Sequence, residues 1–445
     1  MFGVSMHLMM KIVVGVGILC SGWAFESTQF ANLSSVSQAD LLKAIQSAVL
    51  SGRLAQLKEY ITKNPSQFQK LDVPAVYFDV GTNYYRQKNF YLALMTFTEG
   101  YFMKGSEQAR AGCAYYAARI LYQQNNRESA LFYVNRCLEL VNEKEELVTL
   151  AKRLKRQIRW EYLSRDEGLP DESISDICFD GDDVYFAMWT GGIARFTRSS
   201  LELKLYSQKN SGLRSDHTRT LALEGDTLWV GTYGGLCSYN KKTGKWVSQG
   251  GELGSVPVKK VMLVEGKLYV ATLGQGLFVK DKEGFRKIFS TSLYVSDVLF
   301  VDGQMVIATM DKGVYVFEDG KEIAHLLPKE TVKSLALFEG KLYGGTHGDG
   351  MFRVKPGEWK TIEWVEGLSS SYVETLQVYR GVLVIGTLGG GVNFLYPNKQ
   401  VRKLTILDGL SSNDVVRIRP EKNRLWFGTL SGGIAILLVE TMEDI

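Results

Sequence analysis

One short phrase recurs along the sequence, and this repetition limits the possible folds more than any other feature. The phrase is an apolar run, Gly-Thr, a glycine turn and a second apolar run, as in "LWVGTYGGLCSY" (228–239) and "LWFGTLSGGIAI" (425–436). Seven copies follow one another at intervals of 37 to 44 residues. The threonine is present in six copies and is replaced by Met188 in the first. A strand-like period near 40 residues is typical of a repeat array.

Each repeat contains four strand-like segments. In 373–406, a β-rich run is followed by a polar turn, the phrase itself and a more polar segment. Four short antiparallel strands form one blade of a β-propeller, in which radial repetition protects the sheet edges. A superhelical β-solenoid is the alternative, but its repeats are usually much shorter. The sequence therefore predicts a seven-bladed β-propeller over 158–445.

The last repeat lacks a fourth strand. Its third strand-like run is 432–440, and only five residues follow it. The segment 158–173, which precedes the first blade, is similar to the ends of other repeats, such as 402–414. We expect residues 158–165 to be the outer strand of blade seven, because this pairing closes the ring and leaves no open edge.

The repeats resemble a known family. The segments "GLPDESISDICFDGDDVYFAMWTGGI" (168–193) and "GLSSNDVVRIRPEKNRLWFGTLSGGI" (409–434) are similar to the two-component-regulator propeller repeat. Blades three to five lack its opening Gly-Leu phrase, and the Gly-His and Trp-Asp pairs of tryptophan-aspartate propellers are missing. Propellers of this family commonly lie outside the membrane, ahead of a membrane span and a kinase. Since this chain ends at the propeller, the resemblance implies signalling through a separate partner.

The N-terminal segment has the features of an export signal. Lys11 precedes the apolar stretch 12–25, which is too short to span a membrane comfortably. Small residues at Gly22 and Ala24 predict a signal peptide over 1–24, cleaved before Phe25. Lipidation at Cys20 is the alternative, although the preceding residues lack the small side chain that this modification expects.

Residues 25–157 are predicted to form a helical repeat domain. Tyr77, Gly81, Tyr84, Ala93, Phe97 and Gly100 resemble the tetratricopeptide (TPR) pattern, in which small residues let paired helices approach. A second copy runs from Ala114 to Cys137 with the same spacing. The Lys and Arg residues at 152–159 fit the solvated face of a capping helix, so we expect no nucleic-acid binding.

Composition and motifs indicate no enzyme. The formal net charge of +4 over 445 residues implies no polyanionic partner. No metal-ligand spacing, nucleophile elbow or phosphate loop is present, so we expect no metal, no cofactor and no catalysis. Calcium at the acidic turn 179–183 is less plausible than a solvated turn. The four cysteines after the leader lie in apolar patterns and fit small buried residues.

One face of the propeller is the candidate binding surface, because the loops entering the inner strands and the glycine turns meet there. Six residues on this face are the candidate ligand or partner contacts: Trp189, His217, Tyr233, His347, Asp349 and Asn413. A polar ring is expected to line a water-filled channel: Asp176, Thr220, Lys260, Asp297, Ser334, Thr375 and Arg417.

These features predict a secreted or periplasmic, non-catalytic scaffold that binds protein or peptide partners through a TPR groove and a propeller face. The alternative is a sensory module that binds a small solute on the propeller and signals through a separate partner. No membrane span is expected after removal of the leader. A deep pocket at the channel mouth would favour the solute sensor, and a broad shallow face would favour the scaffold.

Overall fold

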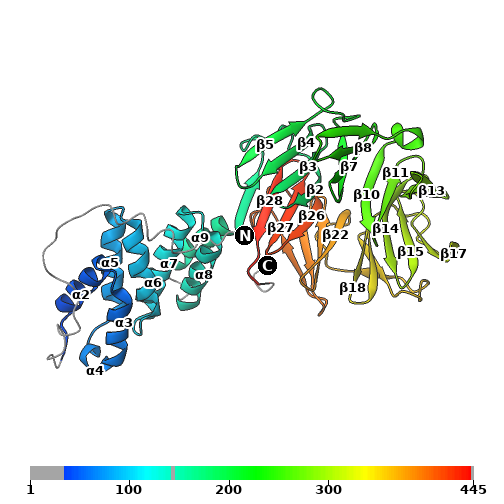
Figure 1. Ribbon diagram of the computed structural model, residues 1–445. Helices are drawn as coiled ribbons and strands as arrows, with labels where there is room; N and C mark the ends of the chain where they lie inside the picture. Colours follow the sequence, from blue (N-terminus) through cyan, green and yellow to red (C-terminus); the bar gives the residue numbers. More distant parts are fainter. Residues whose placement is uncertain (1–34, 142–145, 442–445) are drawn as a thin grey trace. The chain divides into compact units, whose positions relative to one another are not determined.

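The computed structural model describes residues 35–141 and 146–441. The predicted signal peptide (1–24), with Cys20, lies outside these ranges. The chain divides between Ile158 and Arg159 into a helical unit and an all-β unit (Figure 1).

The helical unit consists of antiparallel helices joined by short turns. The described helices are α2 (Gln38–Leu50), α3 (Leu54–Lys63), α4 (Pro65–Phe68), α5 (Val73–Arg86), α6 (Phe90–Phe102), α7 (Glu107–Gln123), α8 (Arg127–Leu140) and α9 (Glu146–Arg159). Side-chain caps define several helix starts; Asn89 accepts a hydrogen bond from Leu92 N and Ser106 accepts one from Ala109 N. None of the described helices combines the length and apolarity that crossing a membrane requires.

Small residues allow close helix contacts in this unit. A Cβ on Gly81 would lie 2.5 Å from the Phe97 ring, and one on Gly100 would lie 2.7 Å from Tyr77 Cβ. Both glycines therefore let α5 and α6 approach around buried aromatic side chains. This packing agrees with the spacing in the sequence, whereas the assignment to the TPR family stays a prediction.

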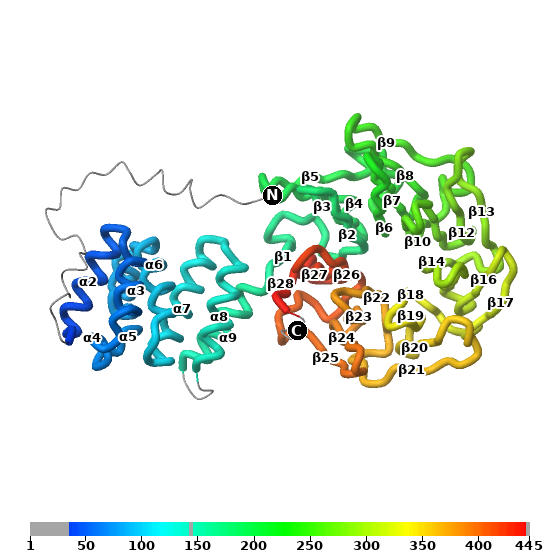
Figure 2. Tube along the Cα trace, turned by 60° about the horizontal axis from the view of Figure 1, so that its bottom comes forward, coloured from blue at the N-terminus to red at the C-terminus, as the bar shows by residue number. Residues whose placement is uncertain are grey.

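The all-β unit is a ring of seven four-stranded antiparallel sheets, as the sequence predicts (Figure 2). In chain order the first six blades are β2 (Ile174–Asp180), β3 (Asp183–Met188), β4 (Gly192–Thr197) and β5 (Glu202–Tyr206); β6 (Thr218–Glu224), β7 (Thr227–Thr232), β8 (Gly235–Asn240) and β9 (Lys245–Ser248); β10 (Val258–Val264), β11 (Lys267–Thr272), β12 (Leu277–Lys280) and β13 (Phe285–Phe289); β14 (Val295–Val301), β15 (Gln304–Thr309), β16 (Val314–Glu318) and β17 (Lys321–Leu326); β18 (Val332–Phe338), β19 (Lys341–Thr346), β20 (Met351–Val354) and β21 (Glu363–Val365); β22 (Val373–Tyr379), β23 (Val382–Thr387), β24 (Val392–Leu395) and β25 (Val401–Leu404). A short 3₁₀ helix, η2 (Gly251–Gly254), precedes β10.

The seventh blade joins the two ends of the unit. Its strands are β26 (Val415–Glu421), β27 (Arg424–Thr429), β28 (Ile434–Leu438) and, on the outside, β1 (Trp160–Leu163). The outer strand is shorter than the expected 158–165, because 158–159 still belong to α9. Trp160 Nε1 and Tyr162 Oη donate hydrogen bonds to the carbonyls of Asp408 and Gly409, which fixes the strand against blade six.

The threonine of the repeated phrase has the same structural role in six blades: its hydroxyl donates to a glycine carbonyl of the following turn. The hydroxyl of Thr429, for example, donates to Gly433 O and accepts from Gly432 N. Gly433 has a φ of 66°, and an added Cβ would lie 2.2 Å from Leu163 O. Only glycine therefore fits this turn, which lies directly against the closing strand.

Blade one lacks the threonine, and the next blade supplies the missing hydroxyl. Thr218 occupies a position where the other six inner strands have Val or Ile. Its hydroxyl accepts from Met188 N at 2.9 Å and lies 2.6 Å from Gly192 O. In the other blades the bond from the threonine hydroxyl to the glycine carbonyl lies within one blade. Here the corresponding bond runs from Thr218 of blade two to Gly192 of blade one.

Candidate functional site

All seven inner strands share an irregularity at the same end. The register to the second strand shifts between the first and third residues of each inner strand, as in a β-bulge. The second residues therefore bulge out of the ladder and line one end of the central channel. These bulge residues are Ser175, Arg219, Lys259, Ser296, Lys333, Glu374 and Val416. We call this end the channel mouth.

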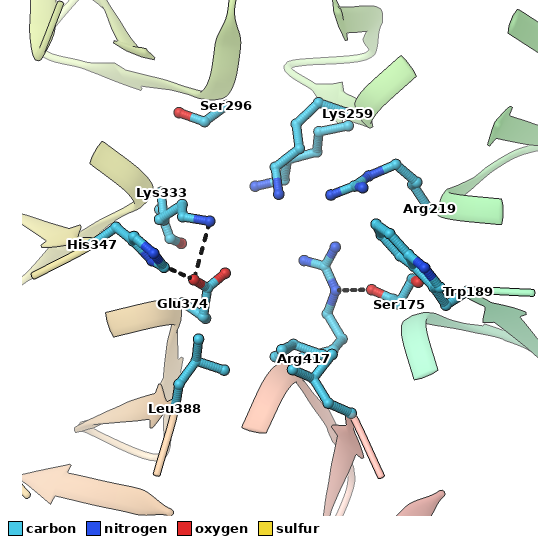
Figure 3. A pocket seen from close by; sticks show the side chains of 14 residues that line it. Ser175, Trp189, Arg219, Lys259, Ser296, Lys333, His347, Glu374, Leu388 and Arg417 are labelled. Atoms are coloured by element: carbon cyan, nitrogen blue, oxygen red, sulfur yellow. Dashed lines mark hydrogen bonds and ion pairs between the residues drawn. The ribbon is translucent and has the colours of Figure 1, made fainter. Parts of the chain in front are cut away.

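A pocket of about 250 Å³ lies at the channel mouth. Besides the bulge residues, it is lined by Trp189, His347, Leu388, Leu430, Lys260, Ser334 and Arg417. Figure 3 shows Lys259, Arg219, Arg417 and Lys333 extending toward the same central space from different blades. The pocket is therefore a strongly basic cavity, with aromatic and aliphatic side chains around it.

Aromatic rings form one side of the mouth. Trp189 packs edge-to-face on Tyr233, with ring centroids 5.7 Å apart, and His217 Nδ1 donates to Trp189 O at 2.8 Å. The Arg219 guanidinium lies 4.6 Å from the centre of the Trp189 ring and 5.4 Å from that of Tyr233. Trp189 and Tyr233 are 36% and 40% exposed, so their rings present surface to a ligand.

The opposite side of the mouth carries a carboxylate. Glu374 accepts from Lys333 Nζ at 3.0 Å and from His347 Nδ1 at 3.1 Å, and His347 packs edge-to-face on Tyr372. Burial opposes the charge of Glu374, but Lys333 and Lys259 hold its pKa below the ordinary value. Glu374 is therefore ionised and already engaged by neighbouring groups.

Lys259 differs from the other cations of the pocket. Burial lowers its pKa to about 7, and the positive charges of Arg219 and Lys333 contribute in the same direction. Neither a hydrogen bond nor an ion pair to its ammonium group is present within 35–141 and 146–441. The nearby charge of Glu374 opposes this lowering but does not overcome it, so the charged form of Lys259 is costly in this structure.

The third residues of the inner strands form what we call the waist of the channel: Asp176, Thr220, Lys260, Asp297, Ser334, Thr375 and Arg417. Asp176 is fully buried, accepts from Leu221 N, and pairs with Arg417 and Arg419 at 3.0 and 2.9 Å. Thr220, Asp297 and Ser334 likewise accept from a backbone N–H of the next inner strand. These bonds connect neighbouring blades.

The expected water-filled ring is thus only partly correct. Five waist residues line the channel cavities, but Asp176 and Thr220 are completely buried and do not. Below the waist lies a cavity of about 580 Å³. Its lining combines apolar side chains, such as Leu223, Leu263 and Leu337, with the polar Gln377 and Arg419, so this cavity is of mixed character.

Comparison with known proteins gives the fold a context. No family model matches the chain, and no curated protein matches it. Among solved structures, the extracellular domain of the putative hybrid two component system BT3049 from B. thetaiotaomicron aligns with a TM-score of 0.55 and 20% identity, over 63% of this chain and 41% of that one. The extracellular domain of the putative one component system BT4673 from B. thetaiotaomicron aligns with a TM-score of 0.51 and 16% identity, over 63% and 40%.

The all-β unit shares its fold with these extracellular domains. The propeller resemblance seen in the sequence is therefore confirmed at the level of the fold. Because this chain spans about two fifths of their length, their signalling roles do not transfer with the fold.

The six predicted contacts fall into three groups. Trp189, His217 and Tyr233 form the aromatic side of the mouth, and His347 lines the pocket across from them. Asp349 instead faces Glu330 outside the pocket. Asn413 accepts from Ile406 N and its carbonyl accepts from Gly391 N, so it holds two loops together.

The bulge residues were missed by sequence reasoning. The strict alternation of strands directs attention to the third residues of the inner strands, and each bulge moves the channel-lining position by one residue. A usable signal is present in "TRT", "VKK", "VKS" and "VET", where a charged side chain directly follows the first residue of an inner strand.

The described residues contain no group of three or more His, Cys, Asp and Glu side chains that could hold a metal ion. Cys113, Cys178 and Cys237 are outside any disulfide, and burial raises the pKa of each of these three thiols. The Cys113 thiol, for example, lies next to Pro74 O in the core of the helical unit.

Proposed function

We propose that this protein is an extracytoplasmic, non-catalytic recognition module that binds a small solute at the channel mouth of its propeller. The observation that carries this proposal is the convergence of the bulge residues on one pocket beside the exposed Trp189 and Tyr233 rings. A compact pocket with a few directed polar groups and aromatic walls is typical of small-ligand sites.

The geometry favours this solute-binding alternative over a propeller scaffold. A protein partner would use a broad surface with an apolar centre, whereas the candidate residues surround a basic pocket of about 250 Å³. That volume accommodates one functional group of a ligand, with the remainder lying over Trp189, Tyr233 and Tyr372 at the rim.

Two further observations support an extracytoplasmic location. The similar solved structures are extracellular domains of putative regulatory systems. The segment 1–24 also carries the sequence features that predict a signal peptide. By analogy, a ligand-bound propeller would report to a separate membrane partner.

The test is ligand capture by the full chain. Protein purified from its host's envelope, or incubated with an extract of that envelope, is examined by native mass spectrometry for a bound small molecule. We expect one species in the wild type and a loss of affinity of about 1–3 kcal/mol on Trp189→Ala or Tyr233→Ala, with little change in melting temperature.

Trp364→Ala is the matched control, because Trp364 is 44% exposed on the outer strand β21, away from the pocket. This variant should retain the ligand fully. If Trp189→Ala and Tyr233→Ala instead lower stability by about 3–5 kcal/mol with unchanged binding per folded molecule, the rings are packing elements and the proposal fails.

A protein partner remains a second candidate for the helical unit. The Arg119 guanidinium lies within 5.5 to 5.7 Å of the ring centres of Tyr85, Tyr115 and Tyr116, on helices α5 and α7. Such Arg–Tyr clusters are enriched among residues that dominate protein interfaces. Affinity capture with Arg119→Ala and Tyr85→Ala, beside the wild type, tests this role independently of the propeller.

A further inference from the structure

The charges of the channel mouth do not balance. Five cations line its pocket: Arg219, Lys259, Lys260, Lys333 and Arg417. Three of them pair with carboxylates, namely Lys260 with Asp297, Lys333 with Glu374, and Arg417 with Asp176. Two cations, Arg219 and Lys259, have no carboxylate partner among the described residues.

These two cations also have few hydrogen bonds. The one hydrogen bond of the Arg219 guanidinium within the described ranges is a long contact of 3.5 Å to Tyr233 Oη, and the Lys259 ammonium has none there. A guanidinium offers five N–H donors and an ammonium three. Most of these donors are therefore available to a ligand in the pocket.

Holding such cations together without a counter-charge is unfavourable. Each is partly removed from water, and Lys333 and Arg417 add positive charge across the channel from blades five and seven (Figure 3). Cations in a desolvated cluster are normally paired. Glu374 favours the charged forms of both cations, but this one carboxylate is already bonded to Lys333 and His347, so it offsets only part of the excess.

We infer that the solute carries an oxyanion, a carboxylate, sulfate or phosphate group, which binds between Arg219 and Lys259. This inference rests on the proposed function and names the chemical class of its ligand. Arg219 is held in place by the Trp189 and Tyr233 rings, so its planar donor edge is oriented before the ligand arrives. Lys259 approaches the same space from the next blade.

The aromatic side of the mouth defines the rest of the ligand. Trp189 and Tyr233 flank Arg219 and are exposed, so an apolar or ring-shaped body attached to the oxyanion can pack on them. A cationic ligand would be repelled by the two unpaired cations. A long polyanion does not fit, because the pocket of about 250 Å³ holds a single group.

The experiment uses three probes that share one ring and differ in charge: benzoate, phenyl phosphate and neutral benzamide. Saturation-transfer NMR and calorimetry at constant ionic strength measure their binding to the full chain. We expect at least one anion to bind about tenfold or more tightly than benzamide, since the charged contacts are absent from the neutral probe. A preference between benzoate and phenyl phosphate distinguishes carboxylate from phosphate as the natural group.

The variants Arg219→Gln and Lys259→Met should each weaken anion binding about tenfold or more and leave benzamide unchanged. Lys267→Met is the matched control, since Lys267 is exposed at the β10–β11 turn, at the other end of the strand that carries Lys259. Its binding should equal that of the wild type.

The inference is overturned if the anions and benzamide bind equally, if no anion binds below about 10 mM, or if the two variants bind anions as well as Lys267→Met does. These outcomes are separate from failure of the proposed function. A neutral molecule captured from the envelope extract and lost in Trp189→Ala would support solute binding while refuting the oxyanion. If anion binding depends on Arg219 but no solute is captured from the envelope extract, the oxyanion site is supported. The proposed function, recognition of a natural small solute, then fails.

Discussion

The waist and the mouth of the channel are built from adjacent residues of the same seven strands, but their charged side chains differ in how completely they are paired. At the waist, Asp176 is fully buried and bonded to blades on both sides through Leu221 N, Arg417 and Arg419. At the mouth, one residue earlier in each strand, Arg219 and Lys259 have no carboxylate partner among the described residues.

This difference separates stability from binding within one channel. Removing one member of a buried, fully paired charge cluster is strongly destabilising, because the remaining charges are left buried without a partner. A cation without a partner adds no stability and, when buried, lowers it, but it is available to a ligand. We therefore expect waist substitutions to change unfolding and mouth substitutions to change affinity.

The largest effect should come from Asp176→Asn at the waist. The loss of one charge leaves Arg417 and Arg419 unpaired near the axis, so the free energy of unfolding should fall by about 3–5 kcal/mol. Chemical denaturation measures this change. An equally stable variant would show that the waist does not hold the blades together.

Acid should mimic this substitution. Burial opposes the charge of Asp176, but Arg417, Arg419 and two backbone N–H groups hold its pKa below the ordinary value. The stabilisation is therefore complete above the pKa of an unfolded aspartate, about 3.9, and is lost as pH falls through the lower folded pKa. The acid limb of the wild-type stability curve should be reduced in Asp176→Asn.

An intermediate effect on stability is expected at Thr218, which lies at the mouth end of its strand but bonds blade two to blade one. Thr218→Val removes the hydroxyl that satisfies Met188 N and Gly192 O, and stability should fall by about 1–3 kcal/mol. The double variant Met188→Thr/Thr218→Val recreates the arrangement of the other six blades and should regain much of this loss. Solute affinity per folded molecule should stay unchanged in both, and a loss without recovery would contradict the inferred exchange.

The smallest loss of stability should come from substituting Lys259, where the main response is in affinity. Its pKa is lowered to about 7, so the charged form predominates only below that pH in the unliganded protein. Binding of benzoate should take up a proton above pH 7 and weaken by at most about tenfold per pH unit. Calorimetry in buffers of different ionisation enthalpy measures the proton uptake.

Lys259→Arg should remove this pH dependence while retaining the affinity. Stability should rise with pH, whereas affinity falls, because Lys259 binds its proton more tightly in the unfolded chain than in the folded one. The wild type should therefore gain stability as pH rises from about 7 toward the ordinary lysine pKa, and Lys259→Met should lack this gain. An affinity independent of pH in the wild type would show that Lys259 does not contact the ligand.

Much of this protein follows from local sequence. A phrase repeated seven times determines seven sheets, since each strand alternates and each glycine turn requires a positive φ, as at Gly433. The similarity between 158–173 and the ends of other repeats indicates where the outer strand of blade seven lies. The repeat also predicts that Trp189, Tyr233 and His347 lie on one face of the propeller, because each directly follows the second strand of its blade.

The tertiary structure decided the chemistry of the channel. A bulge at the start of every inner strand moved the lining position by one residue, and periodicity alone does not reveal such a shift. The partners of each charge depend on ring closure, as in the pairing of Asp176 with Arg417 and Arg419 from the last blade. Whether a cation is paired or available is a property of groups distant in the chain, so it becomes visible only when the seven blades are assembled.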